Sequence, residues 1–338
     1  MVACQEGRLR LGGYRNLEVH ESGDRMARKF VIDCDPGIDR ALALSLALFA
    51  PEIEVVAVTA VAGTVDADQS TFNVQLVIEQ TDAPRLPRVG AARQVEGVPL
   101  ANGRLLHGND GLGDCGYTTS KLHHQHPSDK LICDAVRSAP EETSILCLGP
   151  LTNIAAAFQR DPELPDLIHE LIICGGTVCA PGTVAPTAEF NIFCDVASAR
   201  KVLRTPLAIT IVPLDVTRAV PFSIDFVERL PNAATRVGSF LRKITPHLFR
   251  SYHHHLGLEH VYLEAAVATI AALEPELFER QSWPVDVETA GELTLGQTVF
   301  DRRPRRYSPR ESLVEVACST DPEAVVRRVI SGLQRAAS

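Results

Sequence analysis

The sequence predicts an α/β fold in which a mostly parallel, doubly wound sheet forms a single domain. Short apolar runs with strand character alternate with helical patterns through much of the chain. Polar or glycine-rich residues recur directly after the expected strands, which is where such sheets bind ligands. Hydrophobic residues make up 45% of the 338 residues, so a large core can be buried, and no linker marks a second domain.

The expected elements can be placed by residue number. Strands are expected at 29–32, 53–60, 143–148, 171–174, 207–212 and 284–288, and a turn followed by a strand at 291–296. Helices are expected at 41–48, 66–80, 152–159, 235–250, 258–273 and 321–335. The pattern becomes mainly helical from residue 223 to residue 273, so a helical part is expected in the C-terminal half before the last strands and the closing helix.

Three aspartates lie close together where the first expected strand ends. Asp33 and Asp35 follow the apolar run 29–32, and Asp39 precedes the apolar helix 41–48 after a Pro-Gly turn. Parallel sheets bind ligands at the carboxyl ends of their strands, so these carboxylates should crowd one small volume. Like charges repel there, and a cation, a proton or a hydrogen-bonding polyol must offset them. A helix cap with a solvated turn explains one such aspartate more easily than three.

Charge and cysteine content narrow the classes of partner. The net charge of −9 argues against nucleic acid or an anionic membrane as the main partner, and no run approaches the roughly 20 apolar residues that span a bilayer. The nine cysteines include no C-x-x-C pair, which predicts free thiols and a cytoplasmic protein. Residues 1–25 lack periodicity, so we expect a poorly ordered tail followed by one domain at 26–338.

Five segments, in order along the chain, resemble the motifs of the inosine-uridine-preferring nucleoside hydrolases. They read DCDPGID (33–39), HGNDGLG (107–113), LGPLTNIA (148–155), EFN (189–191) and TLGQT (294–298). One such motif would be weak evidence, but five in the same order over residues 28–335 are specific. The resemblance implies a single α/β domain assembled as a homodimer or homotetramer. It also implies a nucleoside-salvage enzyme that cleaves the N-glycosidic bond of a small ribonucleoside with water, giving ribose and free base.

The resemblance also implies roles for individual residues. Asp35 would be the general base that deprotonates water, with Asp33 as its neighbour, and Asp39 would bind ribose hydroxyls. Glu189 and Asn191 would hold the 5′ side of the ribose. Carboxylates and amides suit the recognition of a polyol, because they supply acceptors and donors for its hydroxyls. The alternatives are a solvated loop charge for Glu189 and a turn residue for Asn191.

Two further positions are candidates on the same grounds. His107 would order a loop that closes near the site, although an ordinary loop histidine fits the sequence nearly as well. Tyr252 and one histidine of 253–255 or His260 would contact the leaving base by stacking or proton donation. A flexible, solvated histidine-rich loop is an equal alternative for that segment.

The sequence departs from the family at its calcium ligands. In the family, the ligands of Ca²⁺ include two aspartates and a backbone carbonyl. The first aspartate directly follows the position of Asp39 and is Arg40 here. The second belongs to a His-Asp pair, which counting back from Glu274 places on Glu264 and Ala265, or after a small slip on 262–263. Only the carbonyl position, Leu148, is kept, so Asp35 and that carbonyl would remain as ligands if calcium were bound.

Arg40 changes what this site is expected to do. A guanidinium has no acceptor and stays protonated, so binding of Ca²⁺ is predicted to be weak or absent. Arg40 could instead offset Asp35, a pair worth about 4 kcal/mol before desolvation at about 4 Å and an effective dielectric near 20. It would then lower the pKa of Asp35 and weaken it as a base. It could also donate to ribose hydroxyls or to a phosphate.

Three functions therefore compete on the sequence alone. The first is a hydrolase acting on a nucleoside or related N-riboside, metal-independent and slow. The second is a catalytically inactive relative that binds a ribosyl ligand. The third is a hydrolase with a changed substrate, such as a phosphorylated riboside whose anion Arg40 would bind. The fold alone does not choose among them.

Overall fold

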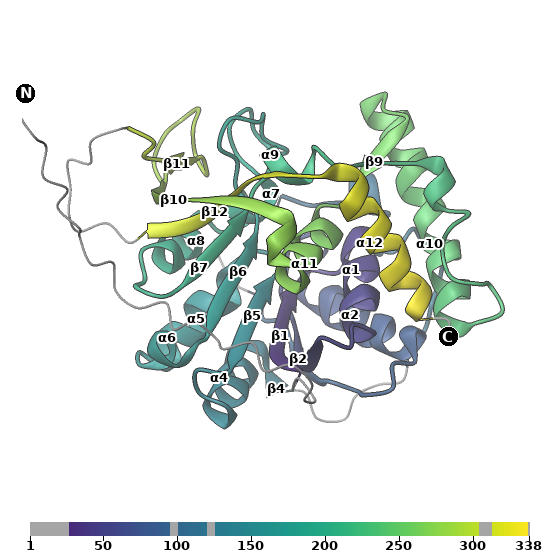
Figure 1. Cartoon of the computed structure of the whole chain (residues 1–338), viewed down its shortest axis with the longest axis horizontal. Coiled ribbons are helices and arrows are strands. Elements are labelled where there is room, and N and C mark those ends of the chain that lie inside the picture. The colour runs from purple at the N-terminus through teal and green to yellow at the C-terminus, as the bar shows by residue number, and fades with distance from the viewer. Residues whose placement is uncertain (1–26, 95–100, 120–125, 304–312, 337–338) are drawn as a thin grey trace, which may run out of the picture.

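The computed structural model describes residues 27–94, 101–119, 126–303 and 313–336. Its central feature is a ten-stranded sheet with the strand order β11-β10-β12-β7-β6-β5-β1-β2-β3-β4 (Figure 1). The strands are β1 Arg28–Cys34, β2 Ile53–Ala60, β3 Arg88–Ala91, β4 His126–Pro127, β5 Thr143–Cys147, β6 Glu170–Cys174, β7 Ile209–Val212, β10 Phe278–Val287, β11 Thr298–Phe300 and β12 Leu313–Thr320. A separate two-stranded sheet joins β8 Pro221–Ser223 to β9 His260–Tyr262.

Strand direction confirms the predicted mostly parallel sheet. The strands from β4 through β1 to β7 and β12 pair in parallel, whereas β10 runs antiparallel to both β12 and β11. The strands at the centre are continuous apolar runs, because helices cover both of their faces. In β5 every residue is buried, and in β6 four of the five are.

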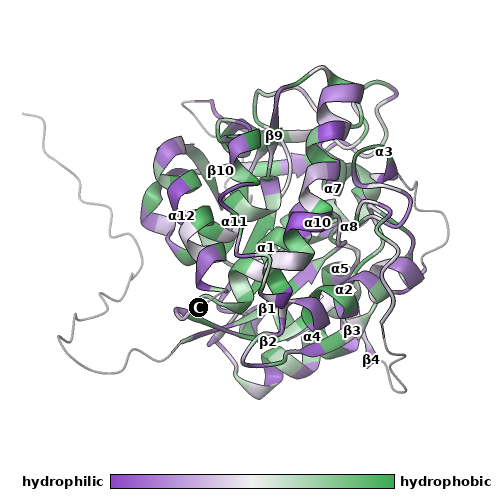
Figure 2. Cartoon of the chain, turned by 90° about the vertical axis from the view of Figure 1, so that its right-hand side faces the viewer, coloured by the Kyte–Doolittle hydropathy of each residue, from purple (hydrophilic) through white to green (hydrophobic). Residues whose placement is uncertain are grey.

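Helices form a layer on each face of the sheet. The larger core lies under α1, α2, α10, α11 and α12, and the other lies under α4, α5 and α8. Figure 2 shows hydrophobic strands inside, and helices such as α12 that carry both hydrophobic and hydrophilic residues. The longer helices are α1 Ile38–Leu48, α2 Ala67–Thr81, α4 Ser128–Ser138, α5 Thr152–Arg160, α8 Val196–Leu203, α10 Arg236–Ser251, α11 Glu264–Leu273 and α12 Pro322–Arg335. The short ones are α3 Arg104–His107, α6 Leu164–Leu167, α7 Phe190–Cys194, α9 Leu214–Thr217, η1 Ile224–Phe226, η2 Tyr252–Leu256 and η3 Pro275–Leu277.

Most predicted elements are confirmed, with two corrections. The helix expected at 258–273 is wrong at its start, because residues 260–262 pair with β8 as strand β9 and the helix begins at Glu264. The strand expected within 291–296 is wrong too, because the chain still turns there, with a positive φ of 80° at Gly296, and β11 begins only at Thr298.

Two further predictions concern the N-terminal residues and membrane-spanning segments. The tail expected at residues 1–25 lies outside the described residues, so the structure does not test it. Within the described ranges, every helix is too short or too polar to cross a bilayer.

Candidate active site

The three aspartates of the first βα turn converge at the carboxyl end of β1. Asp33 is the second-last residue of that strand, and Asp35 directly follows the strand. Asp39 lies in the first turn of α1. All three residues are buried, with exposed fractions of 3% or less. A backbone hydrogen bond of 2.8 Å from Leu148 N to Asp33 O ties the end of β5 to this turn.

Asp33 is fixed by hydrogen bonds from β2 and α5. Its Oδ1 accepts hydrogen bonds from Thr59 Oγ1 at 2.5 Å and from Asn153 Nδ2 at 2.7 Å. Asn153 lies in the first turn of α5 and also donates to Ala60 O, so it joins β1, β2 and α5. Burial raises the pKa of Asp33 to about 7, although these donors oppose the shift.

Asp35 lies at the centre of the cluster. Its Oδ2 accepts from Thr64 N at 2.8 Å and Thr64 Oγ1 at 2.9 Å. Its Oδ1 has no hydrogen-bond partner among the described residues, but it lies 3.3 Å from Arg40 Nε. The loops close tightly around it, since a Cβ on Gly149 would lie 2.8 Å from this Oδ1. Residue 149 must therefore be small for Asp35 to keep this position.

The pKa of Asp35 corrects one expectation. Burial raises it above the usual range, although Arg40 and the two Thr64 donors lower it. Arg40 therefore acts in the expected direction, but the net lowering inferred from the sequence is wrong. Desolvation of a fully buried carboxylate outweighs a single neighbouring cation here.

Arg40 is buried at 6% exposure and gathers acceptors from three segments of the chain. Its Nη1 donates to both oxygens of Asp39 at 3.0 Å, and its Nε donates to Leu148 O at 3.2 Å. Its Nη2 donates to Asn191 Oδ1 at 3.2 Å. The carboxylates that hold Arg40 explain how a cation can occupy the first turn of a helix, which otherwise disfavours positive charge. Burial opposes ionisation of Asp39, but Arg40 and His107 hold the pKa of Asp39 below its usual range.

Glu189 and Asn191 lie beside this guanidinium and are engaged by the protein. Asn191 Nδ2 donates to Leu148 O at 3.2 Å and to Cys174 O at 2.9 Å, at the end of β6. Glu189 caps α7 by accepting from the backbone N–H groups of Asn191 and Ile192, and it also accepts from Gly176 N. Burial raises the pKa of Glu189 to about 7. Both side chains are therefore at the site, where they also brace the loop after β6.

His107 contacts the start of α1 directly. Its Nδ1 accepts from Ile38 N at 3.1 Å, and its Nε2 lies 3.9 Å from Asp39 Oδ1. An Nδ1 that accepts a backbone hydrogen bond must be unprotonated, and burial lowers the pKa of His107 to about 4. The histidine motif thus fixes the helix end that carries Asp39 and Arg40.

The histidine-rich segment that begins at Tyr252 is more exposed than the acidic cluster. Tyr252 is buried in an edge-to-face contact with Tyr262, and burial raises its pKa well above the usual range. His253, His254 and His255 are exposed, and His260 bonds to the Tyr262 hydroxyl. Of residues 252–260, only Tyr252 is buried, and its hydroxyl lies near the acidic cluster, where Glu264 and Asp39 help to raise its pKa.

Sequence reasoning missed one largely buried carboxyl group, that of Glu264, whose side chain is 15% exposed. Glu264 begins α11, and its charge interacts with Arg40, Asp39, Glu189 and Tyr252. It lies where the count back from Glu274 places the family's His-Asp pair, a position considered above only for calcium ligands. A glutamate that opens an apolar helix was the available signal.

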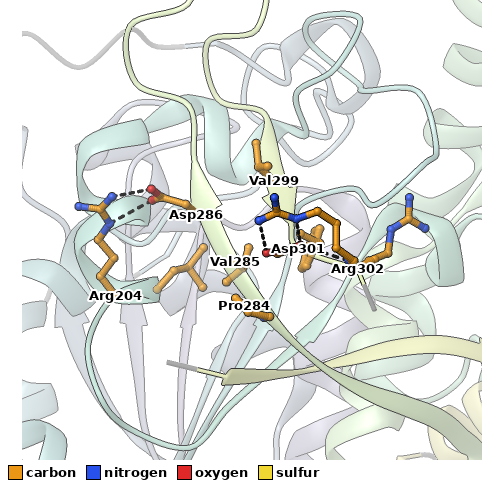
Figure 3. Close-up of a pocket in the computed structure, with 10 residues that line it drawn as sticks. Arg204, Pro284, Val285, Asp286, Val299, Asp301 and Arg302 are labelled. Atoms are coloured by element: carbon orange, nitrogen blue, oxygen red, sulfur yellow. Dashed lines mark hydrogen bonds and ion pairs between the residues drawn. The ribbon is translucent and has the colours of Figure 1, made fainter. Parts of the chain in front are cut away.

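A cavity of about 840 Å³ lies elsewhere in the described part of the chain and shares no lining residue with this cluster (Figure 3). It lies among β10, β11 and the end of α8. Its Asp286 is paired with Arg200 and Arg204, and its Asp301 is paired with Arg303. Those carboxylates are neutralised by half-exposed arginines, so the acidic cluster at β1 remains the stronger candidate for chemistry.

A parallel α/β sheet that carries buried carboxyl groups of raised pKa at the C-terminal ends of its strands is typical of an enzyme that uses acid–base catalysis. Such groups suit general acid–base catalysis, because they can gain and lose protons near neutral pH. The oxygens and amide around them suit a ligand that is rich in hydroxyls.

Comparison with known proteins identifies the family. The family model of the inosine-uridine preferring nucleoside hydrolases matches residues 30–327. The non-specific ribonucleoside hydrolase RihC of Salmonella enteritidis is 36% identical over 295 residues, which cover 86% of this chain and 93% of that protein. Uridine nucleosidase 1 of Arabidopsis thaliana is 30% identical over 324 residues, covering 93% and 96%. The chain belongs to the inosine-uridine preferring nucleoside hydrolase family.

Solved structures agree with this assignment. The plant nucleoside hydrolase PpNRh1 superposes with a TM-score of 0.83 at 28% identity, covering 91% of this chain and 99% of that one. A purine-preferring ribonucleoside hydrolase from Gardnerella vaginalis gives 0.84 at 25% identity, covering 92% and 99%. The predicted single-domain fold of this family is therefore confirmed.

Proposed function

We propose that this protein hydrolyses the N-glycosidic bond of a ribonucleoside or related N-riboside without a bound calcium ion. The observation that carries the proposal is the buried pair of Asp35 and Arg40 at the carboxyl edge of the sheet. The pair keeps a candidate base in the site and places a cation beside it. The names of the relatives, which are ribonucleoside hydrolases and a uridine nucleosidase, support the reaction class.

The residues do not fit the family's calcium ion. Ca²⁺ lies about 2.3–2.6 Å from its oxygen ligands. The two ligands that remain, Asp35 Oδ1 and Leu148 O, lie 3.3 and 3.2 Å from Arg40 Nε, so the guanidinium fills the space between them. The count back from Glu274 places the other ligand at Ala265, which has only a methyl group, or after a slip at 262–263, where no aspartate occurs. Among the described residues, no cluster of three or more His, Cys, Asp or Glu side chains could hold a metal ion.

The proposed reaction divides its tasks among these residues. Asp35 accepts the proton of the attacking water at Oδ1, the oxygen without a hydrogen-bond partner. Asp33 lies behind it, and its raised pKa limits the negative charge that Asp35 faces. The ribose ring becomes positive as the base departs, and the acidic surroundings stabilise it. Asp39, Arg40, Glu189 and Asn191 contact the ribose, while His107 and Tyr252 shape the ends of the site.

One observation favours a second function, a ribosyl-binding protein without turnover. Asp35 has an exposed fraction of 0%, so water reaches it only if the surrounding loops move. The phosphate-reading alternative is less well supported, because each guanidinium nitrogen of Arg40 already has a protein acceptor.

The remaining proposals concern context. We propose a cytoplasmic enzyme of purine or pyrimidine salvage that assembles as a homodimer or homotetramer. Its partner is a small nucleoside rather than a nucleic acid or a membrane, as the negative net charge indicates.

The test is release of reducing sugar from a panel of purine and pyrimidine ribonucleosides. We expect ribose from at least one of them, with loss of release in Asp35→Asn. No ribose from any riboside would reject the hydrolase. Stabilisation of the protein by ribose in a thermal-shift assay, without turnover, would instead favour the binding protein.

A further inference from the structure

The last of the five sequence motifs, TLGQT at 294–298, has no task in the reaction as proposed. Its final residue, Thr298, begins β11 and is buried, with an exposed fraction of 4%. The Thr298 hydroxyl accepts a hydrogen bond from Thr177 N at 2.9 Å and donates one to Thr177 O at 2.8 Å. Thr177 lies in the loop 175–189, which joins β6 to α7. Thr298 therefore fixes the backbone near the start of this loop.

A carboxylate fixes the next three residues of the same loop. Asp215 lies in the first turn of α9, directly after β7, the strand that pairs with β6. Its Oδ2 accepts from Val178 N at 2.7 Å. Its Oδ1 accepts from Cys179 N at 2.8 Å and from Ala180 N at 2.9 Å. Hydrogen bonds to a charged acceptor are stronger than those between neutral groups, so this side chain holds the loop firmly.

The part of the loop held in this way carries a donor to Glu189. Gly176 N donates to Glu189 Oε2 at 3.1 Å. Gly176 has a positive φ of 75°, which favours glycine, and a Cβ there would lie 3.0 Å from Thr298 Cγ2. A Cβ on Gly175 would lie 3.0 Å from Glu189 Oε2. The backbone at this point is packed between Thr298 and Glu189, so a shift of the loop would take the donor away from Glu189.

We propose that Asp215 and Thr298 are positioning residues for ribose recognition. They hold the loop 175–189 so that Gly176 N keeps Glu189 directed at the 5′ side of the ribose. This inference rests on the proposed function, in which Glu189 contacts the ribose. Neither positioning residue touches the reacting atoms, and their effect passes through Glu189. The preference for a substrate with a 5′-hydroxyl group should therefore depend on two residues that do not contact it.

The test compares a ribonucleoside with its 5′-deoxy analogue. A site that hydrogen-bonds a substrate hydroxyl discriminates against the analogue that lacks it, so the wild type should have a kcat/KM about 10-fold or more higher on the nucleoside. Asp215→Asn directs an amide NH₂ at a backbone N–H in either orientation, because both carboxylate oxygens accept from the loop. We expect this preference to fall by about 10-fold, through a higher KM for the nucleoside at nearly constant kcat. The kcat/KM on the 5′-deoxy analogue should change little.

A second variant and two controls accompany this change. Thr298→Val removes the hydroxyl at similar volume and should lower the same preference, whereas Thr298→Ser keeps the hydroxyl and should retain it. Asp225→Asn changes an exposed aspartate of η1 and should behave like the wild type. The preference is a ratio measured on the same folded molecules, so partial unfolding of a variant does not alter it.

Hydrogen exchange tests the same loop without turnover. The amides of 178–180 donate to Asp215, so they should exchange slowly in the wild type. In Asp215→Asn we expect their exchange to become faster by about 10-fold or more, the scale for loss of a hydrogen bond to a charged group. Equal exchange in the variant and the wild type would overturn the inference.

The outcomes separate this inference from the proposed function. If the wild type releases ribose from no riboside, the proposed function fails, and the inference fails with it. If the wild type cleaves the nucleoside and Asp215→Asn keeps the wild-type preference, or loses both substrates equally, only the positioning role is overturned.

Discussion

A single side chain separates this site from the calcium site that the family resemblance implies. Arg40 neutralises Asp35 and Asp39 with one guanidinium, and it gains acceptors from Leu148 and Asn191 that lie far away in the sequence. A guanidinium can hold these oxygens together, but it cannot bind a water molecule and lower the pKa of that water. In the proposed reaction, proton transfer therefore depends on carboxyl groups whose pKa values are raised by burial.

Removal of Arg40 should be costly for stability. Arg40→Met leaves Asp39 buried without its cation, so we expect the free energy of unfolding in urea to fall by about 3–5 kcal/mol at neutral pH. The matched control is Arg327→Met, which removes an arginine that is 61% exposed and pairs with Glu323. That change should cost less than about 1 kcal/mol. Equal losses in the two variants would show that Arg40 is not a buried charge partner.

The same position should be convertible to a calcium site. Arg40→Asp combined with Ala265→Asp places carboxylates near Asp35 and the Leu148 carbonyl, so calorimetry should detect Ca²⁺ with a Kd of about 10⁻³ M or tighter. The wild-type protein should give no such signal. If the double variant is folded and still does not bind Ca²⁺, position 265 does not face the cluster.

At the residue scale, the sequence predicted the site residues that are close together in the chain, but it did not predict those that meet only in the fold. Asp33, Asp35, Asp39 and Arg40 could be found because one turn carries all of them. Glu264 was missed as a participant, because its approach to Asp39 depends on the packing of α11 against α1. The pKa of Asp35 was misjudged for a related reason, since burial is a property of the fold.

At the scale of elements, the start of α1 is the part of the fold on which the site depends. Gly37 precedes the helix and provides no side-chain cap. His107, at the end of α3, accepts the hydrogen bond of Ile38 N instead. The loop after β5 and the N-terminus of α1 thus meet around Asp35, which lies between them.

This interaction should make stability depend on pH. The pKa of His107 is about 4 in the folded protein and about 6.5 in an unfolded chain, so the unfolded state binds more protons between these values. The free energy of unfolding should therefore rise with pH from 4 to 6.5, by up to about 3 kcal/mol more in the wild type than in His107→Gln. Urea denaturation at several pH values measures this difference.

An exposed histidine provides the control for that experiment. His126→Gln should keep the pH dependence of the wild type, because His126 is exposed in β4. A His107→Gln variant with the same slope as the wild type would show that His107 does not accept the bond from Ile38 in solution.

Element prediction succeeded where a pattern is long and buried. The run 53–60 matches β2 in full, and 143–148 extends only one residue beyond β5. The strand β9 was assigned to a helix, because its three residues are extended only through pairing with β8, some forty positions earlier. Such a contact has no local signal in the sequence.

At the scale of the molecule, the site lies at one edge of the central sheet. The acidic cluster draws on β1, β2, β5 and β6, which are neighbours in the strand order, and on helices of the larger core. The alternation of strands and helices was sufficient to predict this single-domain architecture, because strand pairing in parallel sheets follows from it. A strand was expected at 284–288, but the antiparallel direction of β10 could not be anticipated, since it depends on long-range pairing with β12.

The domain boundary gives a prediction at this scale. A chain that begins at Met26 should have the same melting temperature as the full chain, because β1 begins at Arg28 and the described core residues begin at Phe30. Differential scanning calorimetry on both chains measures this. A large fall in melting temperature for the shorter chain would mean that residues before 26 pack on the domain.

The most direct test of the account is ribose release by the wild-type protein before and after treatment with EGTA, followed by addition of Ca²⁺. Because the Arg40 guanidinium lies between Asp35 and the Leu148 carbonyl, the account predicts one rate under all three conditions. Loss of activity in EGTA that is restored by Ca²⁺ would contradict it.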